Sequence, residues 1–259
     1  MKMEVVEYHV HDRIGTITLN RPEKRNALSP QMVSELKFAF GQASSDASVK
    51  VIILRAHGEA FCAGADLAYL QQLQHFSLEE NRLDSQNLKD LFYQIYTLNK
   101  IVIAQVQGQA LAGGCGLAMV CDLVFAAPQA AFGYTEVKIG FVPAIVMIFL
   151  IRKIGEGRAK ELLLTGNIIT SQEALALGMV TRIAASGSLE KEVNDFALQL
   201  AEHTSSQSLS LTKKMMGDVQ RLSLEEALEY AVGQNALARN TEDCKRGIDA
   251  FLKKQPLKW

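Results

Sequence analysis

The chain has 259 residues, of which 48% are hydrophobic and 21% are charged, and its formal net charge is −1. This length and apolar content fit one α/β domain with a large core, with or without a helical appendage. The near-zero charge gives no bulk electrostatic attraction to nucleic acid or to an anionic membrane surface, so we expect neither as a partner.

The four cysteines and five histidines show no spacing typical of a metal site, so we expect no metal. We interpret the cysteines as buried free thiols and keep a catalytic thiol as the lesser alternative. Free thiols are typical of a reducing compartment, and the N-terminus has no basic segment followed by an apolar one. We therefore expect a cytoplasmic protein.

The predicted elements alternate between strands and helices up to about residue 188, which favours a largely parallel sheet flanked by helices. Ser29 is the expected N-cap of the first helix, with Pro30 at its first helical position. The predicted strands are 5–9, 14–19, 51–56, 101–106, 123–126 and 179–183. The predicted helices are 30–47, 78–99, 189–203, 206–219, 224–239 and 241–253.

Two other segments allow more than one interpretation. Residues 139–151 are almost entirely apolar but too short to span a bilayer, which needs about 20 apolar residues. We expect them to form a buried loop entering a core or interface helix. Residues 57–59 and 70–80 form either a lid over a ligand or a surface helix and loop.

Two glycine-bearing turns, residues 61–66 and 112–122, each connect a predicted strand to a predicted helix. Turns without bulky side chains can aim two backbone N–H groups at one point and form an oxyanion hole for a carbonyl oxygen. Glu136 follows the second turn between apolar segments, where burial would raise the pKa of its carboxyl group. Together these features predict carbonyl activation combined with one acid/base group. Asp66 is expected to cap the next helix, and Asp122 to bond backbone amides.

The turns and several further motifs resemble the crotonase superfamily, the enoyl-CoA hydratase and isomerase group. The matching segments occur in the family's order, and they are 19–22 with 26–28, 61–66, 108–122, 132–140, 164–166, 174–178 and 248–252. The resemblance implies a spiral of repeated ββα units over residues 1–188. It implies a C-terminal helical region over residues 189–259 that makes trimer contacts, in a homotrimer or a dimer of trimers.

The resemblance also assigns roles within the site. It implies that the backbone N–H groups of Ala65 and Gly113 form the oxyanion hole and that Glu136 moves a proton at the acyl chain. Tyr134 and Thr135, which flank Glu136, are expected to orient it. The implied acyl-CoA contacts are Arg25, Ala27, Ala63, Ala65, Asp66, Leu67, Gly113 and Gly116. The last helix, through Phe251 and Lys254, is expected to reach a neighbouring subunit's CoA site. No cofactor is implied, because coenzyme A is part of the substrate.

Gly116 departs from the family pattern, because many hydratases carry a second glutamate at that position. The resemblance is closest to methylglutaconyl-CoA hydratase-like members, which implies hydration of a 2-enoyl-CoA with a branched or carboxylated acyl chain. We expect a substrate carboxylate or a water molecule to fill the space beside Gly116. Two alternatives stay open, a Δ3,Δ2-enoyl-CoA isomerase that uses the same residues and a non-catalytic acyl-CoA-binding protein.

Overall fold

The computed structural model describes residues 2–259. Its main sheet has six strands in the order β1-β2-β3-β4-β6-β9. Only β1 and β2 pair antiparallel, and the other neighbours are parallel. The strands are β1 (Val6–His11), β2 (Ile14–Leu19), β3 (Val51–Ala56), β4 (Ile101–Val106), β6 (Leu123–Ala126) and β9 (Arg182–Ile183).

A second, three-stranded sheet has the order β5-β7-β8, with β5 (Gln109–Leu111), β7 (Ala131–Gly133) and β8 (Ile168–Thr170). These short strands were not predicted, because three residues carry too little periodicity to be recognised. They hold the chain before and after the second glycine turn, so they position the candidate site.

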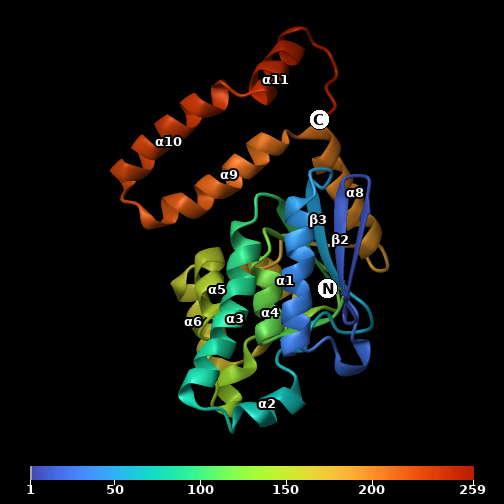
Figure 1. The fold of residues 1–259 in the computed structure, drawn as a ribbon, viewed down its shortest axis with the longest axis vertical. Helices are drawn as coiled ribbons and strands as arrows, with labels where there is room; N and C mark the ends of the chain where they lie inside the picture. The colour runs from blue at the N-terminus through green and yellow to red at the C-terminus, as the bar shows by residue number, and fades with distance from the viewer. Residues whose placement is uncertain (1) are drawn as a thin grey trace.

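Helices cover both faces of the main sheet (Figure 1). The first part of the chain contains η1 (Pro22–Lys24), α1 (Pro30–Ser45), α2 (Leu67–Leu73), α3 (Leu78–Thr97), α4 (Gly113–Met119), η2 (Thr135–Ile139), α5 (Val146–Ile154), α6 (Glu156–Thr165) and α7 (Ser171–Leu177). The remainder contains α8 (Leu189–His203), α9 (Ser206–Asp218), η3 (Val219–Arg221), α10 (Leu224–Arg239) and α11 (Glu242–Leu252).

Strand β3 shows how one sheet serves two cores. Ile52 and Leu54 belong to the larger core, with α1, α3 and α4, while Val51 and Ile53 belong to a smaller core against α8. Successive side chains of a strand point to opposite faces, and both faces here are covered, so the run is continuously apolar.

The predicted C-terminal region 189–259 contains one helix that covers the sheet, α8, and three that project beyond it, α9, α10 and α11 (Figure 1).

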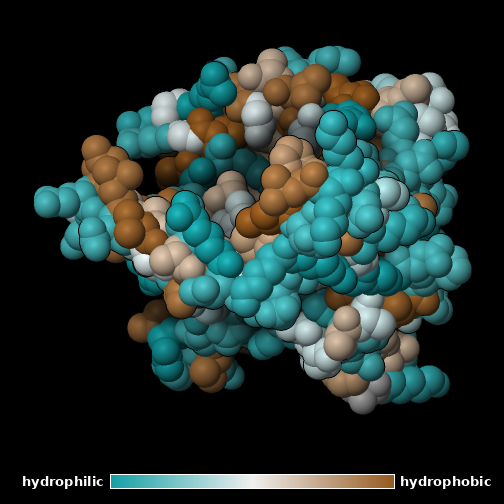
Figure 2. Space-filling view, turned by 90° about the horizontal axis from the view of Figure 1, so that it is seen from above, coloured by the Kyte–Doolittle hydropathy of each residue, from teal (hydrophilic) through white to brown (hydrophobic). Residues whose placement is uncertain are grey.

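The projecting helices α9, α10 and α11 form an arm with unusual exposure. Neither α9 nor α10 has a buried residue. Figure 2 views this end of the molecule and shows hydrophobic side chains in several patches among polar ones. The exposed large apolar residues of this region are Met216, Leu224, Leu228, Val232, Leu237, Ile248, Phe251 and Leu252.

The predicted elements are largely confirmed, with two differences. The strand expected at 179–183 is limited to Arg182–Ile183. Within the single chain, the burial expected at 139–151 is not found in its first part, where Ile139, Phe141 and Val142 are exposed, and cover by another subunit stays a prediction. Only α5 packs into the core, through Val146, Leu150 and Ile154. Within residues 2–259, no helix combines the length and apolarity needed to cross a bilayer.

Candidate active site

The two glycine turns lie against each other, although about fifty residues separate them in the sequence. Gly64 has φ +93°, and a Cβ there would lie 2.9 Å from the Cβ of Ala112 and 3.7 Å from the nitrogen of Gly113. Cys62 N–H donates to the Gln109 carbonyl at 3.1 Å, and Leu111 N–H donates to the Cys62 carbonyl at 3.0 Å. Glycine is needed at position 64 both for the left-handed backbone and for this close approach.

Ala65 is fixed from both sides by a short bridge to Leu28. Leu28 N–H donates to the Gly64 carbonyl at 2.7 Å, and Asp66 N–H donates to the Leu28 carbonyl at 3.1 Å. Within residues 2–259, the N–H groups of Ala65 and Gly113 have no hydrogen-bond acceptor. Gly113 is the first residue of α4, where helical N–H groups are free to bind a ligand oxygen.

Ala65, Gly113 and Glu136 all line one cavity of about 330 Å³. Its walls come from α2, α3, the start of α5 and both turns. The apolar lining includes Leu28, Val33, Ala63, Leu67, Leu88, Phe141, Val142 and Val146. The polar lining includes Tyr69, Asp84, Ser85, Asn87 and Thr135. A mostly apolar cleft with a few converging polar groups is the usual form of a small-molecule site.

Glu136 lies in η2, and its side chain is 8% exposed. Its Oε2 atom is buried without a hydrogen-bond partner among the described residues. Burial raises the pKa of its carboxyl group, and its own backbone N–H offsets part of that rise. A carboxyl group with a raised pKa can both accept and return a proton near neutral pH.

The neighbours of Glu136 differ from the prediction. Tyr134 is fully buried, and its hydroxyl has no hydrogen-bond partner among the described residues. Thr135 lines the cavity. No hydrogen bond joins either side chain to Glu136 in residues 2–259, so the expected orienting contacts are not formed here.

The space expected beside Gly116 is occupied. A Cβ at that position would lie 2.2 Å from Val146 Cγ1 and 3.1 Å from Phe92 Cε1. Gly116 is buried and does not line the cavity. The expectation of a substrate carboxylate or a water molecule beside it is therefore wrong, because α5 packs on α4 and fills the gap.

Asp66 caps a helix and forms an ion pair, and it does not line the cavity. As expected, it caps α2, and its Oδ1 accepts from Tyr69 N–H at 3.1 Å. Arg21 Nη1 donates to its Oδ2 at 2.7 Å, which fixes the segment directly after Ala65. This ion pair was missed, because nothing in the local sequence connects residues 45 positions apart.

The remaining predicted substrate contacts divide into two groups. Ala63 and Leu67 line the cavity together with Ala65 and Gly113. Ala27 is buried, and Arg25 is exposed and donates to Gln109 Oε1 beside a separate hollow of about 560 Å³. Asp122 accepts from Val102 N–H at 2.7 Å, as expected of a structural carboxylate, and also pairs with Lys213.

Two cysteines of the glycine turns, Cys62 and Cys115, are unsuited to nucleophilic catalysis. Cys62 and Cys115 are fully buried free thiols, and burial raises the pKa of each thiol to about 12. A thiol becomes a nucleophile only as the thiolate. Within residues 2–259, no cluster of three His, Cys, Asp or Glu side chains is arranged to hold a metal ion.

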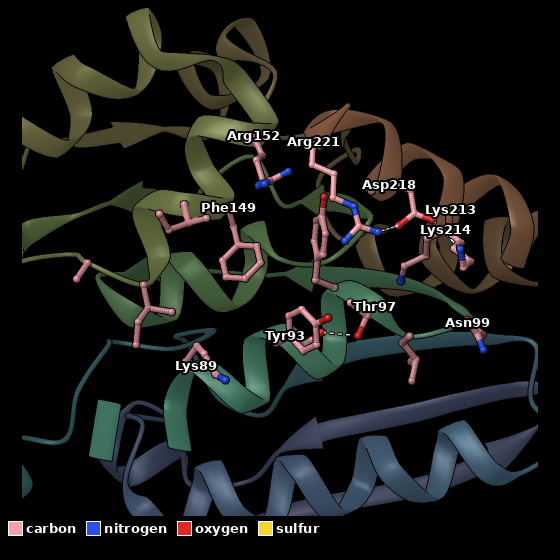
Figure 3. A pocket seen from close by; sticks show the side chains of 16 residues that line it. Lys89, Tyr93, Thr97, Asn99, Phe149, Arg152, Lys213, Lys214, Asp218 and Arg221 are labelled. Carbon is pink, nitrogen blue, oxygen red and sulfur yellow. Dashed lines mark hydrogen bonds and ion pairs between the residues drawn. The ribbon is translucent and has the colours of Figure 1, made fainter. Parts of the chain in front are cut away.

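A larger hollow of about 620 Å³ lies between α3, α5 and α9 (Figure 3). Asp218 in its lining pairs with Lys214 and Arg221, each at 2.6 Å, and Lys213 pairs with Asp122 at 2.7 Å. Arg152 donates to Gln220 Oε1 instead. Of the two hollows, only the smaller one has, among the described residues, a buried carboxyl oxygen without a hydrogen-bond partner, that of Glu136.

Residues 9–259 match the enoyl-CoA hydratase/isomerase family, and the chain belongs to that family. It is 44% identical over 243 residues to a Thermus thermophilus protein named "Putative enoyl-CoA hydratase", covering 94% of this chain and 96% of that one. It is 32% identical over 257 residues to the crotonyl-CoA hydratase of Syntrophomonas wolfei, covering 98% and 97%.

Solved structures confirm the crotonase fold. The enoyl-CoA hydratase of Mycobacterium smegmatis superposes with a TM-score of 0.92 at 30% identity, covering 99% of each chain. A Legionella pneumophila protein named "putative enoyl CoA hydratase/isomerase (crotonase)" superposes with a TM-score of 0.91 at 33% identity, covering 98% of each chain. The predicted family and fold class are thus confirmed.

Proposed function

We propose that this protein hydrates the double bond of a 2-enoyl-CoA thioester whose acyl chain is uncharged. The observation that carries the proposal is the meeting of three free groups in one cavity. They are the N–H groups of Ala65 and Gly113 and the unpartnered Oε2 of Glu136. Two donors can hold a thioester oxygen while one carboxyl group moves a proton.

In the proposed reaction, the Glu136 carboxylate takes a proton from a water molecule as the water oxygen bonds to C3. The C2–C3 π electrons move toward the thioester oxygen, and the N–H groups of Ala65 and Gly113 stabilise the resulting enolate-like charge. Glu136 then delivers the proton to C2. One water molecule is added in total, and no cofactor takes part. Removing one oxyanion donor typically lowers the rate by about 10²–10³.

Hydration is favoured over double-bond isomerisation because the relatives described above carry hydratase names. One of them is named for crotonyl-CoA, whose acyl group is short and uncharged. An isomerase would use the same residues to carry a proton from C2 to C4. A non-catalytic binding protein would not need an unpartnered, buried Glu136.

The cavity lining argues against a carboxylated acyl chain such as that of 3-methylglutaconyl-CoA. Among residues 2–259, no Lys, Arg or His lines the cavity, whereas Asp84 and Glu136 both do. A buried substrate carboxylate would need a cation or several donors to replace its lost hydration. We therefore assign an uncharged acyl chain.

The coenzyme A portion is proposed to lie along Arg25 and Ala27, with Phe251 and Lys254 contributed by a neighbouring subunit. This arrangement requires an oligomer, and we propose a homotrimer or a dimer of trimers. The exposed apolar side chains of the arm supply a surface for such contacts. The four free thiols are consistent with the proposed cytoplasmic location.

The test is a direct comparison of two substrates. Hydration of crotonyl-CoA is followed through the loss of absorbance of the conjugated thioester, and a 3-enoyl-CoA is assayed for double-bond migration. We expect efficient hydration of crotonyl-CoA. Rapid migration without hydration would establish the isomerase instead, and inactivity on both would leave the binding protein.

A further inference from the structure

Tyr69 and Asp84 form a hydrogen-bonded pair in the wall of the same cavity as Glu136. The Tyr69 hydroxyl donates to Asp84 Oδ1 at 2.6 Å, and both residues line the cavity. Tyr69 belongs to α2 and Asp84 to α3, so the pair bridges two helices. Neither residue belongs to the motifs that identify the family.

The pair is held in place at the end that faces the oxyanion hole. Asp66, directly after Ala65, caps α2 through Tyr69 N–H, and Arg21 binds the Asp66 carboxylate. The Tyr69 ring also packs edge-on against Phe76, with ring centroids 6.1 Å apart. The backbone and the ring of Tyr69 are therefore both held in place, and its hydroxyl in turn holds the Asp84 carboxylate.

The charge of Asp84 is not balanced within the cavity. Among residues 2–259, no cationic side chain lines it. The nearby ammonium of Lys37 donates to Asn87 Oδ1 at 2.9 Å and does not line the cavity. The Tyr69 hydroxyl already donates its one hydrogen to Asp84 and cannot donate it to a ligand. An acyl chain that reaches this wall therefore meets the negatively charged carboxylate of Asp84.

We propose that Asp84, held by Tyr69, is a specificity-determining residue that excludes acyl chains ending in a carboxylate and admits uncharged ones. This inference rests on the proposed use of the cavity for the acyl chain. Tyr69 and Asp84 are half-buried, and two like charges at a half-buried site repel more strongly than in bulk water. Discrimination by an introduced repulsion is a common way to reject a similar ligand.

The experiment compares two saturated, isosteric ligands by calorimetry: glutaryl-CoA and its terminal amide, 4-carbamoylbutyryl-CoA. Neither can be hydrated, so the result does not depend on turnover. We expect the wild-type protein to bind the amide at least about tenfold more tightly. Asp84→Asn should reduce this ratio to about threefold or less, while its amide oxygen can still accept from Tyr69.

The matched control is Asp90→Asn, on the same helix but outside the cavity, where the ratio should stay at the wild-type value. A second variant, Ser85→Lys, adds a cation to the cavity lining without altering Asp84. It should also reduce the preference for the amide ligand over the carboxylate ligand, because the cation attracts the carboxylate. Equal wild-type binding of both ligands would overturn the inference. The inference would also be overturned if Asp84→Asn and Ser85→Lys both kept the wild-type ratio of the two ligand affinities. If the ligand affinities show the expected ratios but the protein does not hydrate crotonyl-CoA, only the proposed hydratase activity is refuted.

Discussion

Val146 occupies the space that any side chain at Gly116 would need. A Cβ at position 116 would lie 2.2 Å from Val146 Cγ1 and 2.7 Å from Val146 Cβ. Val146 is the first residue of α5, which packs on α4. A larger side chain at position 116 would therefore require Val146 to move.

Gly116→Ala should destabilise the protein by about 1–3 kcal/mol, the usual cost of overpacking a core. Val146→Ala removes the 2.2 Å contact with Cγ1 but keeps the 2.7 Å contact with Cβ, so the double variant should recover only part of that loss. Gly157→Ala is the control, because a Cβ at that helical position meets nothing within 4 Å. Melting temperatures at one fixed protein concentration provide the measurement. Equal stability of Gly116→Ala and wild type would contradict the close contact.

Glu136→Gln should lower kcat for crotonyl-CoA by at least about 10²-fold, the low end for loss of a general acid/base. The amide keeps the shape of the side chain but cannot accept and return a proton. Glu161→Gln, the same change on an exposed side chain, should leave kcat unchanged. Binding of a saturated acyl-CoA should be retained. Near-normal turnover by a folded Glu136→Gln protein would remove Glu136 from the mechanism.

The raised pKa of Glu136 has consequences for both activity and stability. The proposed reaction begins with the carboxylate, so kcat should fall as the pH falls through the raised pKa, above the ordinary value of 4.5. For stability the sign is opposite. A carboxyl group whose pKa is higher in the folded state favours folding at low pH, and this contribution is lost as the pH rises through the folded pKa.

Glu136→Gln should therefore raise the melting temperature near pH 8 and have little effect near pH 4, where the wild-type carboxyl group is protonated. Parallel thermal melts at the two pH values measure this. An equal rise in melting temperature at pH 8 and at pH 4 would show that the buried charge of Glu136 is not what destabilises the wild-type protein.

Local chemistry explains what the sequence could predict. Ser29 does accept from Met32 N–H at 3.2 Å at the start of α1, as an N-cap before Pro30 should. The two turns were recognisable because their glycines follow apolar strands. Glu136 was recognisable because a glutamate between apolar segments is unusual.

Long-range packing explains what the sequence could not predict. Nothing near Gly116 indicates that Val146, thirty positions later, fills the adjacent space. Likewise, Tyr69 and Asp84 meet only because α2 and α3 fold side by side. The exposed Ile139 is the converse case, since an apolar sequence predicts burial without saying whether this chain or another supplies the cover.

The arm should make the protein oligomeric. Helices α9 and α10 have no buried residues in the single chain, yet they carry large apolar side chains such as Leu224, which is 78% exposed. A helix with an unpartnered apolar face is stabilised by burying it, and closed symmetric assemblies provide this. Sedimentation at micromolar concentration should show trimers or hexamers and no appreciable monomer. A monodisperse species of 28.5 kDa would contradict the proposed assembly.

Gly113→Pro tests the oxyanion hole through the backbone itself. The substitution deletes the N–H that we assign to the thioester oxygen, so activity on every thioester should fall by at least about 10²-fold. Gly113 is the first residue of α4, the helical position at which proline is best tolerated. Ala112 before it has φ 48° and ψ −126°, a backbone that a following proline disfavours, so circular dichroism must first establish that the variant is folded. Gly113→Ala is the matched control: it keeps the N–H, and its Cβ would lie 3.1 Å from Leu28 Cδ1, a flexible side-chain end that can shift slightly. The alanine variant should keep most of its activity. A folded proline variant with activity equal to the alanine variant would show that the Gly113 N–H does not hold the oxygen.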